Sequence, residues 1–293
     1  MTKPELQRNI INILFDKAFA DLIEVSGTEY SELELCSMAY RYAHTCDQCL
    51  NLLTLIKVNT DDKLLSEYIS DIVSAKKNES EFFHCTKPGD VYELEIVLDR
   101  YSATERYVCH DYETALEMIP KWHEHYGDKA CDTTSYTITR RRVLCSGDPF
   151  AEDFVASCVL NKDFSVLRYY SASNVYFGNN CDGECTDCNK KYCLRNVEIT
   201  FPDMFKTGDL VYYNENARIN GYGVVLPEFS DSEEYCIIPL EGRNICYDMS
   251  KAHLDHIHVP KPYARGADES EISGGKGTLC KLYREYREFI GLD

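Results

Sequence analysis

Hydrophobic residues recur at helical spacing through residues 1–80. One apolar stripe at steps of three and four residues consists of Leu33, Cys36, Ala39, Ala43, Cys46, Leu50 and Leu53. This is the period of an amphipathic helix. The pattern predicts helices over about 4–25, 29–57 and 62–77. We therefore expect residues 1–80 to form a helical domain.

The period changes to that of strands shortly after Pro88. Apolar and acidic residues alternate from Tyr92 to Leu98, and a second strand through Cys109 completes a hairpin. A helix follows, and then three strands near about 134–144, 153–160 and 164–170. This order predicts a central antiparallel sheet with a helix on one face, over residues 81–178.

Five short apolar segments separated by turn residues begin at residue 197. They are VEITF, GDLVYY, GYGVVLP, EYCIIPL and NICYD, and such a series is typical of a small barrel or sandwich. Gly208–Val211 followed by Gly221–Val225 resembles the opening hairpin of SH3-like barrels. The resemblance implies a small SH3-like β-barrel over residues 197–263.

Residues 264–293 are predicted to comprise a flexible linker, RGADESEISGGKG, and a final amphipathic helix. The apolar stripe of this helix is formed by Leu279, Leu282, Tyr283, Tyr286 and Phe289. An isolated helix of this length is marginal in water, so we expect it to dock on its own chain or on a partner. The predicted fold class is α+β.

The chain carries 49 acidic and 31 basic residues, a formal net charge of −18. Such a surface repels nucleic-acid phosphates and anionic lipid and suits a basic protein partner, although acidity also serves solubility alone. The N-terminal segment mixes charges among its apolar residues and does not read as a secretory signal. We therefore expect a cytoplasmic protein whose 15 cysteines are thiols or metal ligands.

The segment CDGECTDCNKKYC carries the strongest chemical motif of the chain. Its four thiols are Cys181, Cys185, Cys188 and Cys193, a set that can enclose a tetrahedral ion. Structural zinc is the favoured occupant of this loop, residues 179–196, with an iron–sulfur cluster or free thiols as alternatives. The first three cysteines share the spacing of radical-SAM enzymes, but no series of βα units follows them.

A second candidate metal site lies in AHLDHIHVP. His256 and His258 would share one face of a strand, with His253 and Asp255 near by. The alternative is a set of exposed histidines at the end of a strand. The pair His123 and His125 is predicted to favour the dipole at the end of its helix.

Two further motifs are predicted to be structural. Cys46 and Cys49 lie in a helix, where cysteine packs as a small hydrophobe. The run Arg140 to Arg142 is the only basic cluster, and a solvated edge strand protected by charge is favoured over a phosphate-binding patch.

The sequence carries no Gly-rich phosphate loop, nucleophile elbow or H-E-x-x-H motif. The favoured function is therefore a non-catalytic binding or regulatory protein with structural zinc and an acidic surface. One version is an inhibitor that mimics nucleic acid by presenting carboxylates, and the loop acids Asp231, Glu233 and Glu234 are its first candidates. The alternative is a metal-dependent hydrolase-type enzyme that uses His253, His256 and His258.

Overall fold

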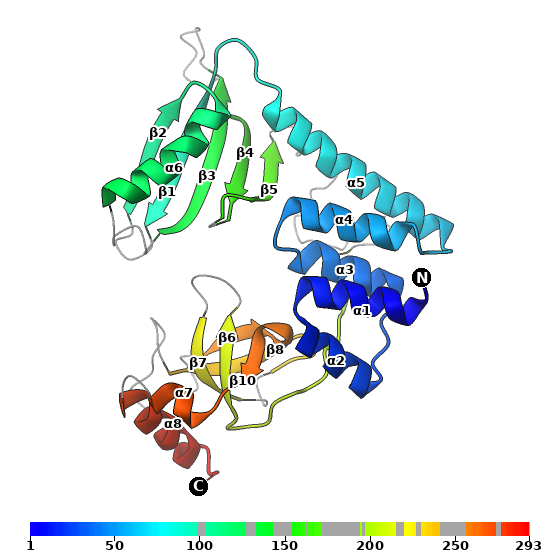
Figure 1. Cartoon of the computed structure of the whole chain (residues 1–293), viewed down its shortest axis with the longest axis vertical. Helices are drawn as coiled ribbons and strands as arrows, with labels where there is room; N and C mark the ends of the chain where they lie inside the picture. The colour runs from blue at the N-terminus through cyan, green and yellow to red at the C-terminus, as the bar shows by residue number, and fades with distance from the viewer. Residues whose placement is uncertain are drawn as a thin grey trace, which may run out of the picture. The chain divides into compact units, whose positions relative to one another are not determined.

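The chain divides into two compact units, each with helices and one antiparallel sheet (Figure 1). The computed structural model describes residues 1–98, 103–126, 133–142, 154–161, 163–171, 194, 197–214, 220–226, 230–240, 256–273 and 277–292. Unit 1 comprises Met1–Thr2 and Ser31–Val197, and unit 2 comprises Lys3–Tyr30 and Glu198–Asp293. The expected α+β class is confirmed. Of the helices described, none has the length and apolar content to cross a membrane.

Unit 1 begins with three helices, α3 (Glu32–Tyr42), α4 (Cys46–Lys57) and α5 (Lys63–His84). The prediction of one helix over 29–57 is wrong, because the backbone adopts an extended conformation at Ala43 and at Thr45. The Thr45 side chain accepts a hydrogen bond from the Gln48 amide and so caps a new helix. Cys36 and Ala39 of α3 and Cys46 and Leu53 of α4 are buried members of the predicted stripe, so the helical period continues across the break.

The sheet of unit 1 has the order β2-β1-β3-β4-β5, and every pairing in it is antiparallel. Its elements are β1 (Asp90–Leu98), β2 (Ala103–Cys109), α6 (Tyr112–Tyr126), β3 (Thr133–Arg142), β4 (Phe154–Leu160) and β5 (Val166–Ser171). Helix α6 covers one face (Figure 1), where Ile119 and Trp122 pack among the inward residues of the strands. The predicted sheet with one covering helix is confirmed.

The sheet of unit 2 has the order β10-β6-β7-β8-β9 and curls into a half-barrel (Figure 1). Its elements are β6 (Leu210–Asn214), β7 (Asn220–Val225), β8 (Glu234–Pro239), β9 (Ile257–Pro260), the 3-10 helix η6 (Lys261–Tyr263), β10 (Ala264–Gly266), α7 (Glu269–Ser273) and α8 (Gly277–Phe289). The short η6 carries the chain from one edge strand directly to the other, and this return curls the sheet.

Two sequence expectations for unit 2 are wrong. Residues 197–201 form no strand, because their amides bond to a loop: the Ile199 amide donates to the Glu233 carboxylate, and the Phe201 amide to the Ser232 carbonyl. The expected linker contains β10 and α7, since Ala264 pairs with Tyr213 of β6. The segment NICYD lies outside the described residues.

The unit 2 sheet is buried on both faces. One face packs against α8 through Leu282, Tyr283 and Tyr286, so the expected docking of the tail takes place on its own chain. The other face forms a second core around Val211, Tyr235 and Val259. Successive residues of β8 therefore enter different cores, and Cys236 faces the α8 side.

Helices α1 (Lys3–Leu14) and α2 (Lys17–Ser26) belong to unit 2. Phe15 and Phe19, which flank the Asp16 cap of α2, stack edge-to-face on Phe201. The Tyr30 hydroxyl donates to the Thr200 carbonyl at 3.0 Å. The segment before β6 is therefore held by the beginning of the chain.

Candidate metal centre

Strands β8 and β9 bring one cysteine and two histidines together. Cys236 lies directly opposite His258 in the antiparallel register, and residues so paired point to the same face. His256 precedes β9 by one residue, and the centroids of the two imidazole rings are 5.3 Å apart. Strand pairing thus places all three side chains in one cluster, which we call the Cys-His-His cluster.

The spacing of the donor atoms suits a metal ion. The Cys236 Sγ and one ring nitrogen from each histidine all lie within 4.8 Å of one another. Tetrahedral zinc, with bonds of about 2.0–2.3 Å, needs donor atoms about 3.3–3.6 Å apart. Binding of an ion would therefore require side-chain rotations that draw the donors closer together. Within the described parts of the chain, this is the only group of three or more His, Cys, Asp or Glu side chains at such spacing.

Exposure rises across the cluster from the core to the solvent. Cys236 is fully buried beside Ile238 in the core under α8. His256 is half-buried, and the His258 side chain is 43% exposed. An ion bound by all three would therefore sit at the rim of the apolar core.

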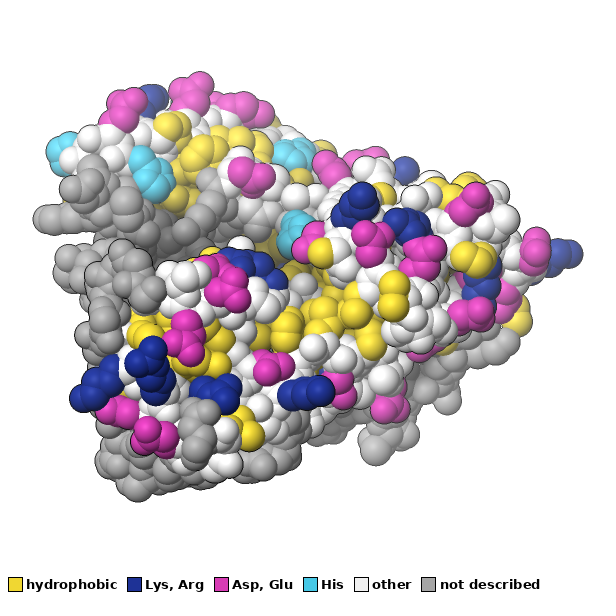
Figure 2. Space-filling model, turned by 60° about the horizontal axis from the view of Figure 1, so that its bottom comes forward, with side chains coloured by type: hydrophobic (Ala, Val, Ile, Leu, Met, Phe, Trp, Pro, Cys, Tyr) yellow, Lys and Arg dark blue, Asp and Glu magenta, His cyan; other side chains and the backbone are white. Residues whose placement is uncertain are grey.

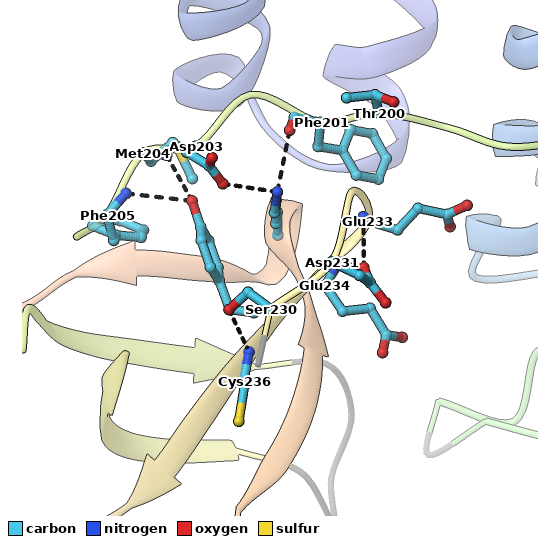
Figure 3. A network of polar contacts seen from close by, with 12 residues as sticks. Thr200, Phe201, Asp203, Met204, Phe205, Ser230, Asp231, Glu233, Glu234 and Cys236 are labelled. Atoms are coloured by element: carbon cyan, nitrogen blue, oxygen red, sulfur yellow. Dashed lines mark hydrogen bonds and ion pairs between the residues drawn. The ribbon is translucent and has the colours of Figure 1, made fainter. Parts of the chain in front are cut away.

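The backbone of Cys236 is fixed by a serine. The Cys236 amide donates to the Ser230 Oγ at 2.9 Å (Figure 3). That hydroxyl donates to the Leu226 carbonyl at 3.0 Å. Asp231 fixes the turn that leads into β8, because its Oδ1 accepts the amides of Glu233 and Glu234, both at 2.7 Å. The thiol is thus held on a rigid strand.

Glu234 lies beside the exposed histidine. Its Oε2 lies 3.8 Å from the His258 Nδ1. A carboxylate at Nδ1 leaves Nε2 to face a metal, and such carboxylate–histidine pairs commonly support zinc ligands.

The far end of β9 is anchored by Lys261. Its side chain is 3% exposed, and its Nζ lies 2.8 Å from the Asp203 carboxylate and 3.4 Å from the Phe201 carbonyl (Figure 3). The ammonium also lies 5.4 Å from the ring centroid of Tyr235. The Tyr235 hydroxyl in turn accepts the amides of Met204 and Phe205. These bonds fix the strand that carries His258.

The structure brings together only part of the residue set predicted from sequence. His256 and His258 share one face as expected. The four loop cysteines, Cys181, Cys185, Cys188 and Cys193, lie outside the described residues, and so do His253 and Asp255. Sequence reasoning missed Cys236, because EYCIIPL reads as a buried strand in which cysteine is one more apolar residue.

Cys46 and Cys49 are core residues, as predicted. Both are buried at the start of α4. Burial raises the pKa of Cys49 to about 11 despite the nearby Lys76. These thiols therefore stay protonated at neutral pH, and among the described residues they belong to no group of three or more metal donors.

His123 does not fit its prediction as a charged residue at a helix end. Its Nε2 contacts the Tyr136 hydroxyl of β3, and burial lowers its pKa. The imidazole is therefore neutral at pH 7 and serves as a contact between helix and sheet.

The edge-strand prediction for Arg140 to Arg142 is wrong, because β3 is the central strand. Arg140 is 1% exposed, donates to the Cys85 carbonyl and lies 3.8 Å from the Asp90 carboxylate. Arg142 approaches the same carboxylate at 3.3 Å, and Arg141 pairs with Glu93. Each guanidinium thus has an acidic partner within the sheet.

The acids of the DSEE loop are bound within the chain. Asp231 is exposed but caps its turn, and Glu233 is half-buried against the Ile199 amide. On the face drawn in Figure 2, acidic and basic side chains are interspersed. A basic partner for the acidic surface stays a prediction.

Comparison of the chain with family models, curated proteins and solved structures finds no match. The function is therefore argued from geometry and chemistry.

Proposed function

We propose that this is a metal-binding protein whose second unit holds a zinc ion at Cys236, His256 and His258. The observation that carries the proposal is the convergence of a thiol and two imidazoles within 4.8 Å. Two neighbouring strands supply these donors, and their register is fixed by Ser230 on one side and Lys261 on the other.

The donor set favours zinc over the hard cations. Thiolate and imidazole suit zinc and other late transition metals, whereas magnesium and calcium require oxygen ligands. The four-cysteine loop, Cys181 to Cys193, is proposed as a second, structural zinc site.

We also propose that strands β6 to β10 form an SH3-like barrel. Two features support this: the order β10-β6-β7-β8-β9, and the 3-10 turn between the last two strands. In this arrangement the cluster lies on the third and fourth strands of the barrel.

Metal content of the purified protein tests the zinc site. Wild type should contain about two zinc ions per chain, one for each proposed site. The double variant His256→Ala/His258→Ala should lose one of them and keep the other, because its substitutions lie at or near the surface. Cys185→Ser/Cys188→Ser is the reciprocal variant and should lose only the loop ion.

The matched control is His110→Ala, which removes an exposed histidine from unit 1. It should leave the zinc content unchanged. If the double histidine variant also retains all of the wild-type metal, the proposal fails. Circular dichroism of each variant verifies folding, so that a lost ion is not mistaken for a lost fold.

A further inference from the structure

We infer that the ion at the Cys-His-His cluster keeps one coordination position open to water or a small anion. This inference rests on the proposed function and concerns what the centre can bind. An open position distinguishes catalytic zinc sites, which have three protein ligands, from closed structural sites, which have four.

The three donors approach the ion from one side. Cys236 and His258 are a direct cross-strand pair. His256 lies two residues before His258, immediately ahead of β9. All three therefore project from one face of two neighbouring strands. Three of the four corners of a tetrahedron are filled from the sheet, and the fourth points away from it.

The gradient of exposure gives the direction of the fourth corner. The thiol is fully buried, whereas the His258 side chain is 43% exposed. The ion would lie between them, so its side opposite Cys236 is toward the exposed rim of the cluster, where no further described His, Cys, Asp or Glu donor joins the group. A zinc ion that kept no open position would need a fourth donor there.

Glu234 lies beside the cluster but is not one of the converging donors. Its Oε2 lies 3.8 Å from the His258 Nδ1, the distance of an ion pair and not of a hydrogen bond.

The charge of the centre selects the class of ligand. A divalent ion with one thiolate and two neutral imidazoles keeps one net positive charge. Such an ion favours hydroxide or another small anion over a neutral molecule, and it lowers the pKa of a bound water. The centre therefore has the ligand class of a hydrolytic zinc site.

The test uses the full-length protein loaded with cobalt(II), whose visible spectrum reports both thiolate ligation and coordination number. Azide is the probe anion. We expect azide to change the visible bands in a saturable way, because it enters the open position. A loop site of four thiolates has no such position and should not respond, so the azide-dependent change belongs to the cluster.

Two variants assign the change. His258→Ala should abolish the azide response, whereas the exposed control Glu285→Gln on α8 should keep it. His253→Ala should respond as wild type does. An azide response that appears only in His253→Ala would mean that His253 fills the fourth corner, and it would overturn the inference.

The failure of this inference is distinct from failure of the proposed function. If the histidine variants leave the cobalt spectrum unchanged, no metal binds at the cluster and the proposed function is wrong. If the histidine substitutions alter the cobalt spectrum but azide has no effect on the wild-type spectrum, metal binds at the cluster in a closed site. In that case only the open position is refuted.

Discussion

At the scale of single residues, Glu105 shows how one carboxylate joins a helix to a strand. The Tyr107 hydroxyl and the Trp122 Nε1 both donate to its Oε2 at 2.6 Å. Burial alone would raise the pKa of Glu105, but hydrogen bonds from Tyr107, Trp122 and Tyr126 outweigh that effect, and its pKa is lowered. The charged form of Glu105 is thus the form that the fold stabilises.

Replacement of Glu105 by Gln should therefore reduce the stability of unit 1 by about 1 kcal/mol. This is less than hydrogen bonds to a buried charged group usually contribute, because the side chain is half-exposed and solvent screens its charge. A carboxylate with a lowered pKa contributes stability above its unfolded pKa, and this is lost as pH falls through its folded pKa. Chemical unfolding should thus show that the free energy of unfolding of Glu105→Gln falls less than that of wild type between neutral and acid pH. Glu117→Gln, which removes only an exposed pair with Lys121, is the control and should change little. Equal stability of the Glu105 variant and wild type at neutral pH would contradict the account.

Sequence reasoning identified His256 and His258 as a pair because a strand places alternate residues on one face. It missed Cys236, which lies 20 residues earlier in the sequence, because only the register of β8 against β9 makes them neighbours. Register depends on the whole sheet. The sequence around a cysteine in an apolar strand does not indicate which residues lie opposite it on the neighbouring strand.

At the scale of elements, the predicted strands GDLVYY, GYGVVLP and EYCIIPL agree with β6, β7 and β8, because each is a short apolar run bounded by turn residues. The prediction of one helix over 29–57 is wrong because the Thr45 side chain accepts the Gln48 amide and so starts a new helix. The spacing of apolar residues does not reveal such a local hydrogen bond. The central position of β3 was missed for a related reason. In the sequence, the run Arg140 to Arg142 indicates an exposed strand. In the structure, Asp90 and Glu93 of the neighbouring β1 pair with these arginines.

Gly223 tests the packing of β7 against β8. A Cβ at this position would lie 2.3 Å from the Ile237 Cγ2 and 2.8 Å from the Ile238 carbonyl oxygen. Because one of these atoms belongs to the backbone, Gly223→Ala should destabilise unit 2 by about 1–3 kcal/mol. Gly266→Ala, whose Cβ would meet only Phe205 at 3.4 Å, is the control. Thermal unfolding that is the same for Gly223→Ala and wild type would refute this tight packing.

At the scale of the whole molecule, unit 2 is assembled from both ends of the chain. The N-terminal segment contributes Phe15, from the turn between α1 and α2, and Phe19 of α2 to the cluster around Phe201. The C-terminal α8 covers the core that contains Cys236. This assembly could not be predicted from the sequence, because contacts between distant segments leave no periodic pattern. The proposed metal centre therefore lies in a unit whose core includes residues of α8.

The most direct test of the central claim is a crystal of the zinc-loaded protein with diffraction measured on both sides of the zinc absorption edge. The account predicts an anomalous peak about 2.3 Å from the Cys236 Sγ and about 2.0–2.1 Å from a nitrogen of His256 and of His258. A difference map that has no peak between these side chains, with Cys236 packed as an ordinary apolar residue, would contradict it.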